Sequence, residues 1–185
     1  MARTRKISEN DILDAAERVV LREGASGLSI DAVAQEAGVS KSRVVYDHKS
    51  KSALLEALIE RRLASEEEHV RAAVDESSHL PHPELFARIS VAEKVPEDID
   101  KAVCIAISAA MSSDKNIHDR MSEWTRKDLA AMETSKKPKA ALIAYLALSG
   151  FYCTEYFNFH QWEPEERLAI LDGIRAIYTN FPEEK

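Results

Sequence analysis

Four side chains between positions 41 and 46 could form hydrogen bonds with a polar partner. They are Lys41, Ser42, Arg43 and Tyr46, and few apolar residues lie among them. The two cations bind phosphate or the acceptor edges of bases, whereas the two hydroxyls can donate or accept. A short helix that presents such donors outward has the properties required of a helix in the major groove of DNA.

Two short helices joined by a tight turn would position these donors. Ser29 and Ser40 can each accept hydrogen bonds from the first backbone N–H groups of a helix, which predicts helices over 30–37 and 41–47. Gly38 lies between them and can end the first helix with a positive φ. The apolar residues of the first helix share one face by their spacing and are Ile30, Val33, Ala34 and Ala37.

Longer helices flank this pair. Ser8 and Asp11 form a capping-box pattern for a helix over 8–23, and Ser50 can cap a helix that continues to about residue 77. Lys51 lies at the start of that helix, where the backbone N–H groups favour phosphate. The apolar residues predicted to point from this helix back into the small N-terminal domain are Leu54, Leu55, Leu58 and Ile59.

The segments from Ala34 to Lys41 and from Ser50 to Leu55 resemble the DNA-binding domain of the TetR family of transcriptional repressors, and the match covers roughly residues 8–60. The resemblance implies an all-α fold of about nine helices. A helix-turn-helix domain would occupy residues 1–52, and a ligand-binding and dimerisation domain would occupy 53–185. It also implies a homodimer that binds a palindromic operator in double-stranded DNA and is released by a small-molecule effector. The expected DNA contacts are Arg5, Ser29, Ser40, Lys41, Ser42, Arg43, Tyr46 and Lys51.

The chain departs from the family pattern at three positions. Val45 stands where the family usually has a tyrosine and is expected to pack, and Ser42 replaces a common glycine. His48 takes an aromatic position, either as a hydrogen-bonded core residue or as a phosphate contact or pH switch. The basic residues before position 8 are either a frayed terminus or a DNA-binding arm. The departures leave an alternative function, a helical sensor or scaffold that has lost DNA binding.

Charge is unevenly distributed along the chain. The net charge is −7, which argues against a protein that coats nucleic acid without specificity. Residues 1–51 contain nine Lys and Arg against eight Asp and Glu, whereas residues 52–185 contain sixteen against twenty-four. The cations are therefore concentrated where the DNA contacts are predicted.

The C-terminal half is predicted to form helices over about 83–92, 97–112, 116–133, 138–160 and 164–180. The segment 99–111 is apolar nearly all round, so we expect it to be buried. From Ala140 to Phe159 the only charged residue is Glu155, yet the polar residues in that run argue against a membrane span.

The helix over 138–160 therefore needs apolar partners on two sides. One face would pack on its own domain, and the other would join a four-helix bundle across a twofold axis, with two helices from each subunit. The residues expected at this dimer interface are Leu148, Phe151, Phe159, Ile170, Ile174 and Ile177.

Aromatic and soft side chains of the C-terminal half could either fill the core or line an effector pocket. Glu155 in particular could be paired with a cation or face a ligand, because an unpaired buried carboxylate is costly. The residues assigned to ligand binding are Cys104, Ile107, Met111, Trp124, Tyr152 and Glu155.

Nothing in the sequence favours an enzyme. It contains no HExxH motif, no nucleophile elbow and no Gly-rich phosphate loop, and His79 with His82 gives only a weak metal signal. We therefore expect no catalytic residue, metal or cofactor. Cys104 and Cys153 are expected to be buried free thiols. Because no apolar segment follows the basic residues at the N-terminus, a cytoplasmic location is expected and no membrane association.

Overall fold

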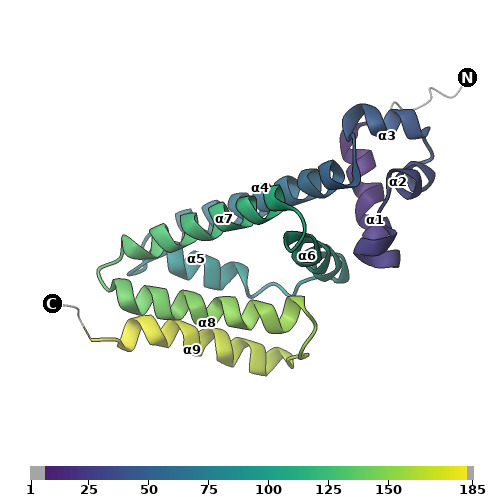
Figure 1. Cartoon of the computed structure of the whole chain (residues 1–185). Helices are drawn as coiled ribbons and strands as arrows, with labels where there is room; N and C mark the ends of the chain where they lie inside the picture. The colour runs from purple at the N-terminus through teal and green to yellow at the C-terminus, as the bar shows by residue number, and fades with distance from the viewer. Residues whose placement is uncertain (1–6, 183–185) are drawn as a thin grey trace, which may run out of the picture. The chain divides into compact units, whose positions relative to one another are not determined.

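The computed structural model describes residues 7–182, in which nine helices and no strand occur (Figure 1). The helices are α1 (Glu9–Gly27), α2 (Ile30–Ala37), α3 (Lys41–Asp47), α4 (Lys51–Glu76), α5 (Pro83–Val91), α6 (Asp98–Met111), α7 (Lys115–Glu133), α8 (Pro138–Tyr156) and α9 (Pro164–Asn180). The predicted all-α class is confirmed. No helix in this described range is long and apolar enough to span a membrane.

The helices form two compact units that do not follow chain order. The first contains the chain up to Arg62 together with Glu97–His118, and the second contains Leu63–Pro96 with Asp119 onward. Helices α4 and α7 thus contribute residues to both units. The division at residue 52 stays a prediction.

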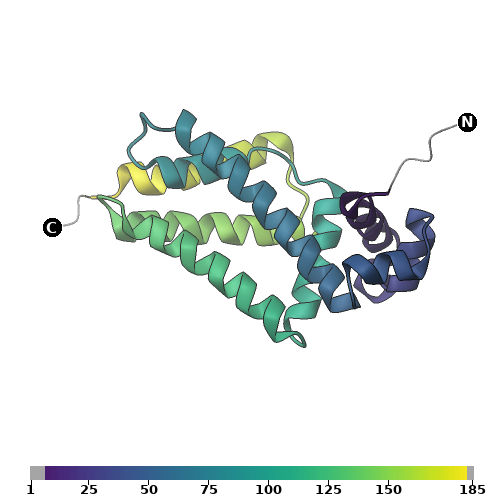
Figure 2. The same ribbon diagram turned by 90° about the horizontal axis from the view of Figure 1, so that it is seen from above.

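In the first unit, α1, α2 and α3 form the predicted three-helix group (Figure 2). Each begins at a serine whose hydroxyl accepts from the helix backbone, with N···O distances of 3.2 Å for Ser8, 3.1 Å for Ser29 and 3.3 Å for Ser40. Gly38 ends α2 with φ 66°, and the next N–H, of Val39, donates to the Ala34 carbonyl at 3.0 Å. The turn between α2 and α3 is therefore fixed by local hydrogen bonds and by one residue with positive φ.

Two helices of the first unit differ from the sequence prediction. Helix α1 continues to Gly27 rather than ending at 23, although Gly24 interrupts it with φ 69°. Helix α6 packs against α1 on one side only: Val103, Ala106 and Ile107 are buried, whereas Ile105 is 44% exposed. The expectation that the 99–111 segment is buried all round was therefore wrong.

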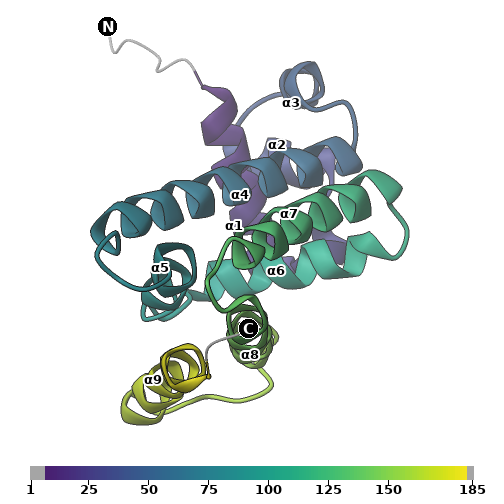
Figure 3. The same cartoon turned by 90° about the vertical axis from the view of Figure 1, so that its left-hand side faces the viewer.

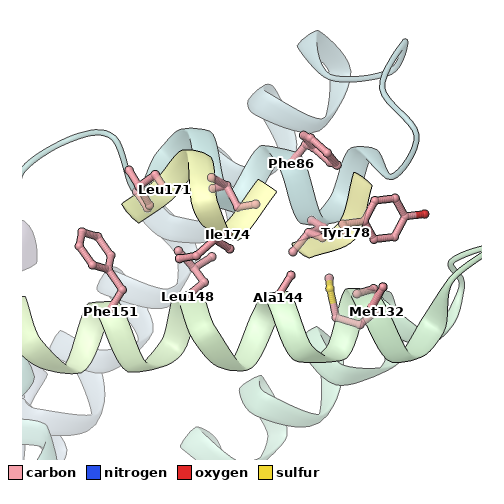
Figure 4. Packing of buried hydrophobic residues seen from close by; sticks show 13 residues of the cluster. Phe86, Met132, Ala144, Leu148, Phe151, Leu171, Ile174 and Tyr178 are labelled. Atoms are coloured by element: carbon pink, nitrogen blue, oxygen red, sulfur yellow. The ribbon is translucent and has the colours of Figure 1, made fainter. Parts of the chain in front are cut away.

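The core of the second unit lies between α5, α8 and α9. Helices α8 and α9 run side by side and antiparallel, joined by a short connection (Figures 1 and 3). Figure 4 shows Phe151, Leu148 and Ala144 of α8 facing Leu171, Ile174 and Tyr178 of α9. Helix α8 ends at Tyr156, earlier than the predicted 160, because Asn158 adopts a positive φ of 53° and the N–H groups of residues 157–159 turn back to the last carbonyls.

Candidate nucleic-acid interface

Helix α3 has an exposed face and an inner face. Positions 41, 42, 45 and 46 are exposed, which places Lys41, Ser42, Val45 and Tyr46 on one side of the helix. Val44 is fully buried, and Arg43 and Asp47 are only partly accessible on the inner side. Three of the four predicted donors therefore share the exposed face, and Arg43 does not.

The exposed donors differ in how firmly they are held. Tyr46 is 83% exposed, with its ring near the Arg43 guanidinium at 5.9 Å. The Lys41 ammonium donates to Asp31 of α2 at 2.9 Å, and both side chains are well exposed. An ion pair so open to water is weak, and a phosphate can replace the carboxylate.

Arg43 is held on the inner side of α3 by two acceptors. Its guanidinium donates to the Asp47 carboxylate one turn later and to the Ile7 carbonyl at 3.2 Å. Sequence analysis gave Asp47 no role, although its i,i+4 spacing from Arg43 was a signal for the ion pair. The pair makes Arg43 a less available base contact than the sequence suggested.

The remaining predicted DNA contacts lie at helix starts. Ser29 and Ser40 cap α2 and α3, and the Ser40 hydroxyl also shares a hydrogen bond with the Ser42 hydroxyl at 3.0 Å. The Lys51 ammonium, at the start of α4, donates to the Ala25 carbonyl. Arg5 lies outside the described residues.

Two family departures have different outcomes. The expectation that Val45 packs inside the domain was wrong, because its side chain is 39% exposed on the face of α3 that carries Tyr46. His48, in contrast, is buried. Its Nε2 has no hydrogen-bond partner among the residues described and lies 3.7 Å from the nearer carboxylate oxygen of Glu9.

Ion pairs tie the helix-turn-helix group to the rest of the first unit. Arg61 of α4 contacts Asp14 and Glu17 of α1, both at 2.7 Å. Arg62 of α4 bridges Glu17 to Asp100 of α6. Helix α6 is thereby attached to the group that carries α3.

Hydrogen bonds hold the start of α4 to the segment that follows α6. The Ser52 hydroxyl donates to Asp114, and this hydrogen bond lowers the pKa of the Asp114 carboxyl below its usual value. Nearby, the Asn116 side chain donates to Glu56 at 3.2 Å. The segment between α6 and α7 is therefore fastened to the helix that follows α3.

The predicted ligand-binding residues fall in different units. Cys104, Ile107 and Met111 lie on α6 of the first unit at spacings that place them on one face. Trp124 on α7 and Tyr152 on α8 belong to the second unit and are partly buried. Burial, followed by the negative charge of Glu66, raises the pKa of the Tyr152 hydroxyl, which therefore stays protonated.

Glu155 is a core ion-pair residue, which corrects its assignment to ligand binding. Both of its oxygens accept from Arg167 of α9, and both side chains are more than nine-tenths buried. Arg167 also donates to three carbonyls at the end of α5, those of Ala92, Glu93 and Lys94. Arg167 was missed in the sequence because nothing in its local pattern distinguishes it from a surface arginine.

Three predicted dimer contacts are also corrected. Leu148, Phe151 and Ile174 are buried in the subunit's own core, so they cannot reach a partner. Ile170 and Ile177 are partly buried against that core, and Phe159 is exposed beyond the end of α8. The exposed apolar residues of the two helices are instead Leu142, Ile143 and Leu146 of α8 and Leu168 of α9. Cys153, expected to be buried, is exposed on α8, and Cys104 is partly buried.

A hollow of about 260 Å³ lies where α7 ends and α8 begins. Its lining is Leu129, Met132, Glu133, Pro138, Lys139 and Leu142. Elsewhere, the His82 ring lies 5.5 Å from the Tyr178 ring, and no three potential metal-ligating side chains gather within residues 7–182.

Comparison with known proteins gives the same assignment to both halves. Residues 12–58 match the family model of bacterial regulatory proteins of the tetR family, and residues 84–179 match a tetracyclin repressor-like C-terminal domain. None of the curated proteins compared matches the chain.

Solved structures share the fold at low identity. A protein from Pseudomonas aeruginosa PAO1 is 17% identical over 94% of this chain and 93% of its own, with a TM-score of 0.73. A transcriptional regulator from Rhodococcus sp. Rha1 is 20% identical over 94% and 97%, with a TM-score of 0.68. The multidrug binding protein EbrR, complexed with malachite green, is 19% identical over 91% and 96%, with a TM-score of 0.70.

The C-terminal model alone covers more than half of the chain, and the N-terminal model covers the helix-turn-helix group described above. Together they show that this chain belongs to the TetR family of bacterial regulatory proteins.

Proposed function

We propose that this protein is a homodimeric transcriptional repressor that binds a palindromic operator and is released by a small-molecule effector. This function requires neither catalysis nor a cofactor. The protein would act in the cytoplasm, where it meets DNA. The observation that carries the proposal is the exposed face of α3, which presents Lys41, Ser42 and Tyr46. Ser40 caps this helix, and its opposite face is buried in the domain.

Each subunit would insert α3 into the major groove. Lys41 exchanges Asp31 for a phosphate, and the Tyr46 hydroxyl and Ser42 hydrogen-bond to phosphate or base edges. Lys51 and the start of α4, with Ser29 and Ser40, hold the flanking backbone. Arg43 binds DNA only where a phosphate or base displaces the Asp47 carboxylate from its guanidinium.

Dimerisation would use the outward face of α8 with α9. Leu142, Ile143 and Leu146 form an apolar face that a single subunit leaves exposed, and the same face of a second copy would cover it. Two heads related by a twofold axis require half-sites about 34 Å apart, or a multiple of that distance.

The effector would act by favouring a head spacing that does not fit the operator. Its influence is limited by its differential affinity for the two spacings. Of the predicted ligand-binding residues, we propose Trp124 and Tyr152 of the second unit as its contacts. EbrR, which shares the fold, was solved in complex with malachite green, a dye with aromatic rings, which supports an aromatic effector here.

Selection of bound fragments from the source genome tests DNA binding. The full-length protein should retain a small set of palindromic fragments, and Tyr46→Ala should weaken binding to them at least about thirtyfold, because one contact of about 1 kcal/mol is lost in each of two half-sites. Leu21→Ala, which truncates an exposed apolar residue of α1, is the control and should leave the affinity unchanged.

A sensor that no longer binds DNA is the second candidate. It is favoured by the pairing of both α3 cations with acids, Lys41 with Asp31 and Arg43 with Asp47. Retention of no fragment by the folded dimer would establish this candidate and exclude the repressor.

A further inference from the structure

Val45 is an apolar side chain placed among polar ones on the exposed face of α3. Lys41 precedes it by one turn and Tyr46 follows it, and its own side chain is 39% exposed. Val44, one residue earlier, is fully buried and already supplies the contact that α3 makes with the core. Part of the Val45 isopropyl group is therefore open to a partner that approaches the exposed face of α3.

The major groove offers one apolar group on its base edges, the 5-methyl of thymine. A valine can neither donate nor accept a hydrogen bond, so opposite a guanine, a cytosine or a phosphate it would remove water from a polar atom and give nothing in return. Opposite a thymine methyl, the isopropyl group buries apolar surface on both partners.

The side chain best suited to read guanine already donates to acceptors of its own protein. Arg43 is the only arginine of α3, and Asp47 and the Ile7 carbonyl hold its guanidinium on the inner side. The exposed face is left with one lysine, one serine, one tyrosine and the valine. Its composition favours recognition through shape and methyl contact over bidentate hydrogen bonding to guanine.

We propose that Val45 is a specificity-determining residue that contacts the 5-methyl group of a thymine, so that each operator half-site carries a T·A pair opposite the middle of α3. The proposal rests on the DNA-binding function proposed above and names the base chemistry that the helix selects.

Deoxyuridine tests this contact, because it keeps every hydrogen-bonding atom of thymine and lacks only the methyl. In the selected operator, each thymine is replaced in turn by deoxyuridine, symmetrically in both half-sites, and affinity is measured for wild type and Val45→Ala. At one position, the replacement should weaken operator binding by the wild-type protein about fifteenfold. This is the product of about fourfold for the methyl group buried in each of the two half-sites. The same substitution should change the affinity of Val45→Ala by less than about twofold.

Leu21→Ala is the control, because it truncates an exposed apolar residue of α1 and leaves α3 unchanged, and it should keep the full sensitivity of wild type. Wild-type affinity unchanged at every thymine position overturns the assignment of Val45. A sensitive position that persists in Val45→Ala overturns it too, because another side chain then contacts the methyl. Both results leave DNA binding intact, whereas failure to retain any duplex overturns the proposed function and the valine contact with it.

Discussion

A cation on a DNA-contacting helix binds phosphate only as well as it competes with the acids of its own protein. In α3 that competition is strongest at Arg43, because Asp47 is only 12% exposed at its side chain and lies one turn away. The pair withholds one positive charge per subunit from DNA.

Asp47→Asn should release that charge. The amide has the shape of the carboxylate but no negative charge, so Arg43 becomes free to bind phosphate. We expect tighter binding to operator and to unrelated DNA, and a plot of log affinity against log salt that steepens by about 0.9 per half-site. Titrations of both duplexes at several salt concentrations measure this.

Asp14→Asn is the charge-matched control for that experiment. It removes the same charge from α1, where Asp14 pairs with Arg61 of α4, and leaves α3 unchanged. Equal steepening in Asp14→Asn and Asp47→Asn would assign the effect to net charge and not to Arg43.

His82 makes the stability of the protein depend on pH. Burial lowers the pKa of its imidazole below the usual value of 6.5, against the opposing effect of Glu84. Below that pH the unfolded chain binds a proton that the folded chain refuses, so the free energy of unfolding falls as the pH falls from 6.5 towards the folded pKa. The slope from this one group is at most about 1.4 kcal/mol per pH unit.

Urea denaturation at pH 7.5 and pH 5.5 should therefore show a less stable protein at the lower pH. In His82→Asn, which cannot titrate, the difference between the two pH values should shrink. His79→Asn removes an exposed neighbouring histidine and should keep the wild-type difference. An unchanged difference in His82→Asn would show that His82 is not the group responsible.

At the scale of elements, the turn between α2 and α3 depends on one backbone conformation. Gly38 has φ 66°, and a Cβ added there would meet no atom within 4 Å. Gly38→Ala should therefore lower the free energy of unfolding through backbone strain alone, by about 1–2 kcal/mol. A shift of α3 relative to α2 would relieve part of this strain. We therefore expect the free energy of DNA binding to change by more than the free energy of unfolding does.

Gly173→Ala separates this strain from the general effect of replacing glycine. Gly173 lies within α9, a Cβ there also meets no atom within 4 Å, and its φ is not positive. Alanine in a helix interior should stabilise the protein by up to about 1 kcal/mol. Urea denaturation of both variants should give opposite signs, and equal signs would contradict the role assigned to the Gly38 conformation.

The elements that could be predicted from sequence are those specified by local chemistry. The helices α1 to α4 begin at serines whose hydroxyls cap them. The glycine between α2 and α3 could be predicted to adopt a positive φ from its position after the last helical residue. The exposed face of α3 could be predicted only in part, because the side to which Arg43 turns depends on Asp47 and on the carbonyl of Ile7.

Helix α8 shows why the rest could not be predicted. It is apolar nearly all round, so periodicity does not say which side meets the subunit core and which side stays exposed. Leu148 and Phe151 were assigned to a partner and instead meet α9, whereas Leu146 lies on the other side. The packing of α5 and α9 and the pairing of Glu155 with Arg167 fix the rotation of the helix.

At the scale of the whole molecule, the DNA affinity of the proposed repressor would depend on two heads acting together. One helix-turn-helix head with few phosphate contacts binds weakly, and a second head held at the correct spacing raises the affinity by the effective concentration that the dimer provides. The apolar face of α8 is therefore as important to the proposed repressor as α3 is, although it never touches DNA.

Leu146→Glu tests that dependence, because Leu146 is 55% exposed and a carboxylate on a twofold-related face would meet its own copy. We expect a folded monomer by analytical ultracentrifugation and a loss of operator affinity of at least about a hundredfold, which is the advantage of joining two sites. Leu21→Glu places the same charge on α1, at a residue of similar exposure, and should leave both the dimer and its affinity unchanged. A Leu146→Glu protein that stays dimeric would remove this face of α8 from the interface. A monomer that binds the full operator as tightly as wild type would remove dimerisation from the mechanism, since a single head would then account for all of the affinity.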